Sequence, residues 1–164
     1  QIDGEGFVSS APWPEYDPDL IDEKVQKAEE IVQGLASDIN EIKKIIDTQP
    51  EKIHIYIAPD WKWDVFKIAK EIGRPDIGQI MGISIKQSLH DDKKEIAEFA
   101  KKIAREVTKT KYVGKIDEYS IIKDSLDFIS HEVRAEVIVY EEPTYDPQNK
   151  SRNAMPYKPA IYIE

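Results

Sequence analysis

Apolar residues in the first third of the chain follow a heptad pattern. They recur at alternating spacings of four and three residues: Ile21, Val25, Ala28, Val32, Leu35, Ile39, Ile42 and Ile46. This periodicity predicts one helix over about 18–47 with a single apolar stripe. Asp17 and Pro18 suit its first turn, and Pro50 disfavours helix just before it. Because the stripe requires a partner, we expect the helix to belong to an all-α bundle.

The periodicity then changes between strand and helix. Ile53, Ile55 and Ile57 alternate with His54 and Tyr56, which predicts a strand. Helices are predicted over about 61–72, 77–81, 92–110 and 117–130, followed by strands near 133–140 and 160–163. Residues 82–89 are ambiguous. Asp60, Asp76 and either Asp91 or Asp92 are expected to cap three of these helices.

This order of elements indicates the fold class and the domains. We expect an α+β fold, with a small sheet and helices in an α/β-like layer, preceded by a long helix from an all-α bundle. The proline-containing break after the first helix places a domain boundary between residues 49 and 50. The units are then 1–49 and 50–164.

Composition limits the function classes. The chain has 164 residues and no cysteine, so it has no disulfide, thiolate metal ligand or cysteine nucleophile. No apolar run approaches the ~18 residues of a transmembrane helix, and no secretory leader is present, so we expect a soluble, cytoplasmic protein. Many Lys, Glu and Ile residues suit a thermophile. Since the chain opens on Gln1, we expect it to be the tail of a longer protein.

Charge is unevenly distributed along the chain. The net charge of −9 argues against a generic nucleic-acid binder. Residues 52–115 nevertheless carry a net +5, between a net −9 over 1–51 and a net −5 over 116–141. A basic centre of this kind suits a polyanion, and chance clustering of surface charge is the alternative interpretation.

No catalytic or metal-binding constellation is present in the sequence. The 7 glycines are scattered and form no phosphate-binding loop. His90 lies beside a predicted helix cap, and His54 is expected to face solvent or a neighbouring domain. With His131 they make three isolated histidines, which form no triad. We therefore predict no catalytic residue and no metal in this chain.

Several features suit RNA. A basic stripe lies opposite the apolar face of the helix predicted over about 92–110, and it comprises Lys94, Lys101, Arg105 and Lys109. An ordinary solvated helix face is the alternative. The polar loop over 142–158 is long and rich in hydrogen-bond donors, including Lys150, Arg152, Asn153 and Lys158. An apolar strand then runs to Ile163 and Glu164, whose carboxylates suit base amino groups. Of Trp61 and Trp63, one is expected in the core and one at a domain joint or on a base.

Several segments together resemble a known family. Residues 7–17, which contain Trp13, Pro14 and Tyr16, resemble the end of the helical anticodon-binding domain in class I aminoacyl-tRNA synthetases of the Leu/Ile/Val group. Residues 52–63 (Lys-Ile-His-Ile-Tyr-Ile-Ala-Pro-Asp-Trp-Lys-Trp) resemble the start of the C-terminal domain in archaeal and eukaryotic-type leucyl-tRNA synthetases. Residues 146–150, 154–156 and 158–164 resemble the extreme C-terminus of the same enzymes.

The resemblance implies a function that residue chemistry alone does not name. It implies that 1–49 ends the anticodon-binding domain and that 50–164 docks on the long variable arm of leucine tRNA. Leucylation and editing, with ATP and Mg, belong to upstream domains of the parent ligase, whose signature motifs are absent here. The expected tRNA-binding residues are Ile163, Glu164, Lys150, Arg152, Asn153, Lys158, Lys94, Lys101, Arg105 and Lys109. The expected partners are leucine tRNA and the upstream domains, with no DNA, membrane or cofactor in this chain.

Three alternatives stay open. The heptad stripe suits a protein-interaction module of a translation-related assembly. His90, Asp91 or His131 would serve a small hydrolase. An isoleucyl-type or valyl-type synthetase tail would share much of the resemblance.

Overall fold

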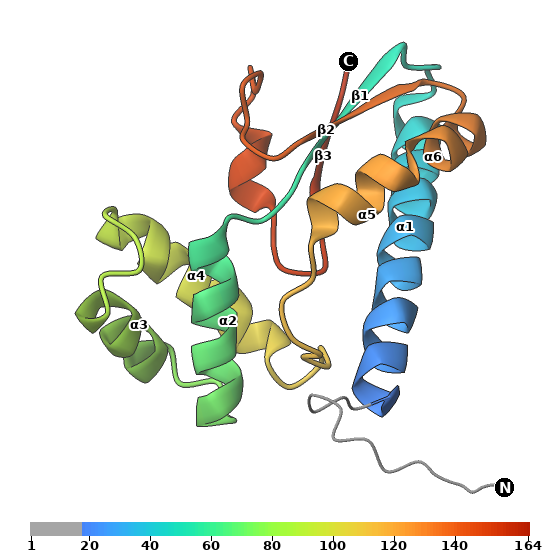
Figure 1. Cartoon of the computed structure of the whole chain (residues 1–164). Coiled ribbons are helices and arrows are strands. Elements are labelled where there is room, and N and C mark those ends of the chain that lie inside the picture. Colours follow the sequence, from blue (N-terminus) through green and yellow to red (C-terminus); the bar gives the residue numbers. More distant parts are fainter. Residues whose placement is uncertain (1–17) are drawn as a thin grey trace, which may run out of the picture.

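The computed structural model describes residues 18–164, and its elements are shown in Figure 1. The helices are α1 (Pro18–Ile46), α2 (Asp60–Ile72), α3 (Ile77–Lys86), α4 (Lys93–Glu106), α5 (Glu118–Asp124), α6 (Leu126–Val133) and the 3₁₀ helix η1 (Lys150–Asn153). The strands are β1 (Lys52–Tyr56), β2 (Glu136–Tyr140) and β3 (Ala160–Ile163). The predicted α+β class is confirmed.

A small mixed sheet organises the centre of the molecule. Within residues 18–164 it has three strands in the order β2-β1-β3, with β1 parallel to β2 and antiparallel to β3. Successive side chains point to opposite faces, so Ile53 and Ile55 share one face while His54 and Tyr56 share the other. Helices α1, α5 and α6 lie beside the sheet in Figure 1 and contribute to the core formed with its isoleucine face.

Two apolar clusters hold the molecule together. The sheet core contains residues of α1, the strands, α5 and α6, for example Ile39, Ile53 and Ile129. The helical core lies among α2, α3 and α4, where Phe66 and Ile103 are buried. Helix α2 serves both, because its Trp63 belongs to the sheet core and its Phe66 to the helical core.

Tyr157 lies where the two cores meet. Its ring packs edge-on against Trp63 at 5.0 Å and Phe66 at 5.8 Å between centroids. Its hydroxyl donates to the Gly114 carbonyl oxygen at 2.6 Å and accepts from the Val113 N–H at 2.9 Å. Burial raises the pKa of this phenol to about 12, so it stays neutral as a donor. The polar loop that contains Tyr157 is therefore a structural joint as well as a surface segment.

Helix α1 buries only the middle of its heptad stripe. Val32, Leu35 and Ile39 belong to the sheet core and pack with α5 and α6. Val25 is 53% exposed and Ile46 is 43% exposed, one toward each end of the helix. Ile21 and the expected cap Asp17 lie outside the residues whose side chains are described. The division between residues 49 and 50 stays a prediction.

Some predicted elements differ from the observed ones. The helix expected over 117–130 is two helices, because the Ser125 N–H bonds the Ile122 carbonyl oxygen three residues back and tightens the chain there. Val133 ends α6 and does not open β2, since Arg134 takes the left-handed conformation that terminates a helix. The ambiguous segment 82–89 extends α3 to Lys86.

The helix caps are partly as expected. Asp76 and Asp92 cap α3 and α4 by accepting backbone N–H groups. Asp60 does not cap α2, because the helix begins at Asp60 itself and its carboxylate pairs with Lys115 at 2.5 Å. Among residues 18–164, no helix has both the length and the apolar character that crossing a membrane needs.

Glu118 is a buried carboxyl group at the start of α5. Glu118 is 2% exposed, and neither of its side-chain oxygens has a partner of ordinary hydrogen-bond geometry among the described side chains of residues 23–164. Burial raises its pKa to about 8, and the nearby N–H groups of Tyr157 and Ala58 lower it only in part. The folded protein therefore holds this group as a neutral acid at pH 7.

Glu118→Gln is expected to stabilise the protein at alkaline pH. The folded pKa lies above the unfolded one, so the stability that wild-type Glu118 contributes is complete below about pH 4.5 and declines as pH rises toward 8. The loss is about 1.4 kcal/mol per pH unit in that window. Thermal unfolding from pH 4 to pH 9 should show the variant gaining on wild type as pH rises. Parallel curves for both proteins would contradict this prediction.

Candidate functional site

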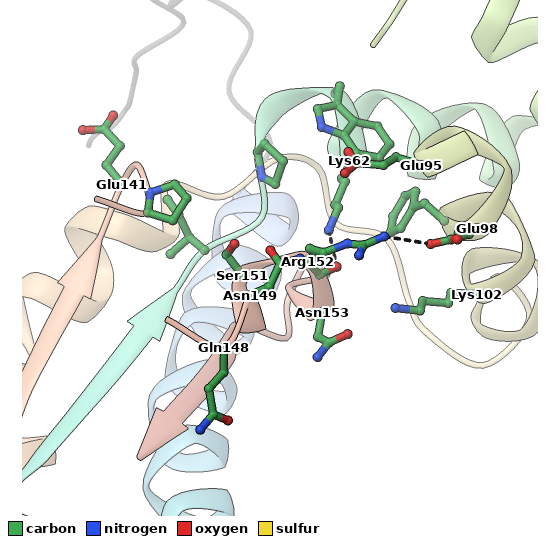
Figure 2. Close-up of a pocket in the computed structure, with 15 residues that line it drawn as sticks. Lys62, Glu95, Glu98, Lys102, Glu141, Gln148, Asn149, Ser151, Arg152 and Asn153 are labelled. Carbon is green, nitrogen blue, oxygen red and sulfur yellow. Dashed lines mark hydrogen bonds and ion pairs between the residues drawn. The ribbon is translucent and has the colours of Figure 1, made fainter. Parts of the chain in front are cut away.

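A cavity of about 710 Å³ lies between the N-terminal ends of α2 and α4 and the segment from Glu141 to Asn153. Its lining combines aromatic, basic, acidic and amide side chains, including Trp61, Phe99, Lys62, Lys102, Arg152, Glu95, Glu98, Gln148, Asn149 and Asn153. Figure 2 shows Arg152 of η1 reaching across to Glu98 of α4, with Lys102 of α4 nearby. The Arg152–Glu98 pair measures 3.2 Å between Nη2 and Oε1. This surface offers both donors and acceptors beside aromatic rings.

Lys62 is the buried cation of this cavity. It is 5% exposed, and its Nζ donates to the carbonyl oxygens of Arg152 at 2.9 Å and Ala154 at 2.7 Å. The ammonium also lies 5.6 Å from the Trp61 ring and 5.5 Å from the Phe99 ring. Burial lowers its pKa to about 8, and the neighbouring Lys102 acts in the same direction. Lys62 thus fixes the polar loop to α2 and places a positive charge at the cavity wall.

The polar loop is ordered by Asp146 as well. Its carboxylate accepts the N–H groups of Lys150 at 2.7 Å and Ser151 at 2.9 Å, which starts η1. Burial alone would raise the pKa of Asp146, but these hydrogen bonds outweigh it and hold the pKa below its usual value. Lys150, Arg152 and Asn153 therefore project from a short, fixed turn.

The predicted basic stripe is exposed to solvent. Lys94, Lys101 and Arg105 lie on the exposed side of α4, opposite buried Ile96, Phe99 and Ile103. Lys109 is exposed beyond the C-terminal end of the helix. Lys94, Lys101 and Arg105 line no part of the cavity, whose α4 residues are Glu95, Glu98, Phe99 and Lys102. The stripe and the cavity are thus neighbouring faces of α4.

The predicted residues at the end of β3 lie in a third place. The Glu164 carboxylate accepts from His54 Nε2 at 2.9 Å and from the Tyr145 hydroxyl at 3.0 Å. These two bonds hold the pKa of Glu164 below its usual value. Its main chain pairs with Lys52, so the segment is fixed against β1. Ile163 is half-buried beside the sheet core, and Lys158 is exposed in the turn that closes on Met155.

Two lysines of the cavity were not predicted from the sequence. Lys62 lies between two tryptophans, and nothing in its local pattern distinguishes it from a solvated helix lysine. Lys102 follows Lys101 in the sequence, but it lines the cavity and does not belong to the predicted basic stripe.

The prediction for His54 is wrong. His54 was expected to face solvent or a neighbouring domain, but it is 2% exposed and lies among tyrosines. Of the tryptophans, Trp63 is in the core and Trp61 stacks on His90 at 4.5 Å.

The described side chains form no site for metal chemistry. Within residues 23–164, whose side chains are described, no group of three or more His, Asp or Glu side chains is placed to hold a metal ion. His90 bonds Glu95 at 2.7 Å and stacks on Trp61, which gives it a structural role. The arrangement suits binding through hydrogen bonds, stacking and charge.

Relatives that match this chain along nearly its whole length include three leucine–tRNA ligases. A leucine–tRNA ligase of Methanothermobacter thermautotrophicus is 50% identical over 161 residues, which is 98% of this chain and 17% of the relative. Leucine–tRNA ligases of Methanothrix thermoacetophila and Pyrococcus abyssi are 36% and 34% identical, over 98% and 100% of this chain. The chain thus spans 16–18% of the length of these relatives. No family model matches the chain.

Lys62→Met is expected to loosen the polar loop. Methionine keeps most of the volume but leaves two carbonyl oxygens, one of them on buried Ala154, without their donor. The cost should be about 1–3 kcal/mol of unfolding free energy. The rate of amide hydrogen exchange over residues 150–158 should also be higher in Lys62→Met than in wild type. Lys102→Met, which removes an exposed lysine of the same cavity, is the matched control. Equal unfolding midpoints for the two variants would rule out the anchoring role of Lys62.

Proposed function

Because this chain belongs with the archaeal leucine–tRNA ligases, as one segment of such an enzyme, we propose that it is their C-terminal tRNA-binding module and that it recognises the long variable arm of leucine tRNA. The observation that carries this proposal is the basic stripe. Lys94, Lys101 and Arg105 face solvent on one side of α4 although the chain has a net charge of −9. An acidic protein with a local basic face binds a polyanion in one orientation.

In this proposal, the stripe and Lys109 contact phosphates. Such contacts supply affinity and register but carry no sequence information. Lys150 and Lys158 add exposed or half-exposed ammonium groups from the polar loop. Arg152 and Asn153 lie at the cavity, where amide and guanidinium groups suit the edges of unpaired bases. Ile163 and Glu164 provide apolar contact and acceptors near the end of β3.

The ligase reaction is assigned to the remainder of the parent enzyme. ATP-dependent leucylation and editing, with ATP and Mg, belong to domains outside this chain in the proposal. This chain then contributes orientation of the tRNA on the enzyme. The exposed ends of the α1 stripe, at Val25 and Ile46, are proposed to pack against those upstream domains.

A protein-interaction module is the second candidate. The same exposed residues of α1, together with Ile45 at 81% exposure, favour it. A second copy or another protein covering this face would give a stable complex. Light scattering of Val25→Ser/Ile45→Ser/Ile46→Ser beside wild type separates the cases, because loss of association points to the protein partner.

Filter binding to leucine tRNA tests the proposed function. The competitor is the same tRNA with its variable arm shortened, at low and moderate salt. We expect preference for the long arm of at least about tenfold, which corresponds to about 1.4 kcal/mol. Equal affinity for both tRNAs would overturn recognition of the arm. Preference for a tRNA with a short arm would favour an isoleucyl-type or valyl-type tail.

Lys101→Ala/Arg105→Ala is expected to weaken all tRNAs alike. Loss of two phosphate contacts should reduce the slope of log affinity against log salt by about two. The matched control is Lys67→Ala/Lys86→Ala, which removes two exposed lysines of α2 and α3 away from the stripe. A salt slope that falls equally in both double variants would show that the stripe has no special role.

A further inference from the structure

Aromatic rings gather on the face of the sheet opposite the isoleucines, where buried Tyr56 lies 5.3 Å from Tyr140. His54 on β1 lies opposite Tyr162 on β3 and diagonal to Tyr140 on β2. The His54 centroid is 5.7 Å from that of Tyr140 and 5.5 Å from that of Tyr162, with interplanar angles of 24° and 23°. Tyr145, from the loop after β2, lies 5.0 Å from His54. We call Tyr140, His54, Tyr145 and Tyr162 the aromatic ladder. Strand alternation alone places its three strand residues on one face.

The ladder is fixed by polar contacts at its rim. The Tyr140 hydroxyl lies 2.9 Å from His54 Nδ1, and His54 Nε2 contacts the Glu164 carboxylate. The Tyr145 hydroxyl donates to the second oxygen of that carboxylate. These bonds restrict the orientation of the Tyr140, His54 and Tyr145 rings, and Tyr162 packs against His54. Restricted rings lose less entropy when a flat ligand stacks on them.

The ladder is accessible on its outer side. Only His54 is buried, whereas Tyr140 and Tyr162 are half-buried and Tyr145 is 42% exposed. Among the strands of residues 18–164, β2 and β3 are the two edges, so Tyr140 and Tyr162 end the row. A row of preorganised rings with exposed ends is the arrangement on which unpaired bases stack. The Glu164 side chain, 44% exposed, lies beside it as an acceptor.

We propose that the aromatic ladder is a base-stacking platform that takes unpaired nucleotides of RNA on Tyr145 and Tyr162, with Glu164 accepting from an exocyclic amino group of a stacked base. This proposal rests on the proposed function and extends it, since it names the nucleotide chemistry and the residues that receive it. Phosphates reach the basic stripe and Lys158, whereas the bases reach the ladder. The acidic rim then selects amino-bearing bases without adding affinity for the backbone.

The alternative role of the ladder is structural. Cross-strand aromatic pairs stabilise a small sheet whether or not a ligand stacks on them. Tyr145 separates the two roles, because it belongs to a loop and its loss removes no strand pair. Tyr145→Phe keeps the ring and removes only the bond to Glu164. Tyr145→Leu keeps apolar bulk and removes the stacking surface.

Binding and cross-linking with leucine tRNA test the platform. Tyr145→Leu and Tyr162→Leu should each weaken binding about tenfold, and Tyr145→Phe should stay within about threefold of wild type. Phe128→Leu is the matched control, since Phe128 is an equally exposed aromatic on α6 outside the ladder. Leucine tRNA substituted with 5-bromouridine, irradiated in the complex, should cross-link to Tyr145 or Tyr162 when the peptides are read by mass spectrometry.

The outcomes distinguish the platform from the function on which it rests. If wild type binds leucine tRNA through its long arm while Tyr145→Leu binds equally well and cross-links lie elsewhere, the platform is overturned and the proposed function stands. If wild type shows no preference for leucine tRNA, both are overturned. Circular dichroism identifies a Tyr162→Leu variant that fails to fold, and in that event Tyr145→Leu and the cross-links decide.

Discussion

Tyr157 packs against both hydrophobic clusters, which helix α2 also links through Trp63 and Phe66. Its ring packs against Trp63 and Phe66, one from each cluster, and its hydroxyl bonds the backbone at Val113 and Gly114. The residue holds a positive φ of 68°, which costs energy for any side chain other than glycine. Packing on both sides of the ring offsets that cost. The position of α4 relative to the sheet, and hence of the basic stripe relative to the aromatic ladder, depends on this joint.

The polar loop is the element on which the binding surfaces converge. Lys62 anchors it to α2 through two carbonyl oxygens, and Asp146 organises its 3₁₀ turn. One end of the loop borders the aromatic ladder through Tyr145, and its centre lines the cavity with Arg152. A long loop of polar residues is usually mobile, but here buried hydrogen bonds give it a fixed shape. Directional contacts of this kind allow an acidic chain to present donors at defined positions.

The charge distribution separates affinity from selection in the proposed complex. Phosphates would be held by ammonium and guanidinium groups on α4, whose attraction is long-ranged and depends on salt. The carboxylate of Glu164 repels phosphates, so it is useful only where a base edge arrives without its backbone. The structure places these opposite charges on different elements, with Glu164 fixed by His54 and Tyr145. Recognition would then depend on the distance between the two surfaces, which the fold fixes.

Periodicity in the sequence indicated the order of most elements and the buried face of α4. Local spacing alone places Ile96, Phe99 and Ile103 on one side of a helix. It also indicated the caps at Asp76 and Asp92, and the resemblance supplied the family. Only the tertiary structure decided where long-range partners meet. His54 is buried because tyrosines from β2, β3 and the loop surround it, and Lys62 is buried because a segment about ninety residues later supplies its carbonyl partners. Such contacts leave no local pattern, since they depend on how strands far apart in the chain pair and on which loop covers them.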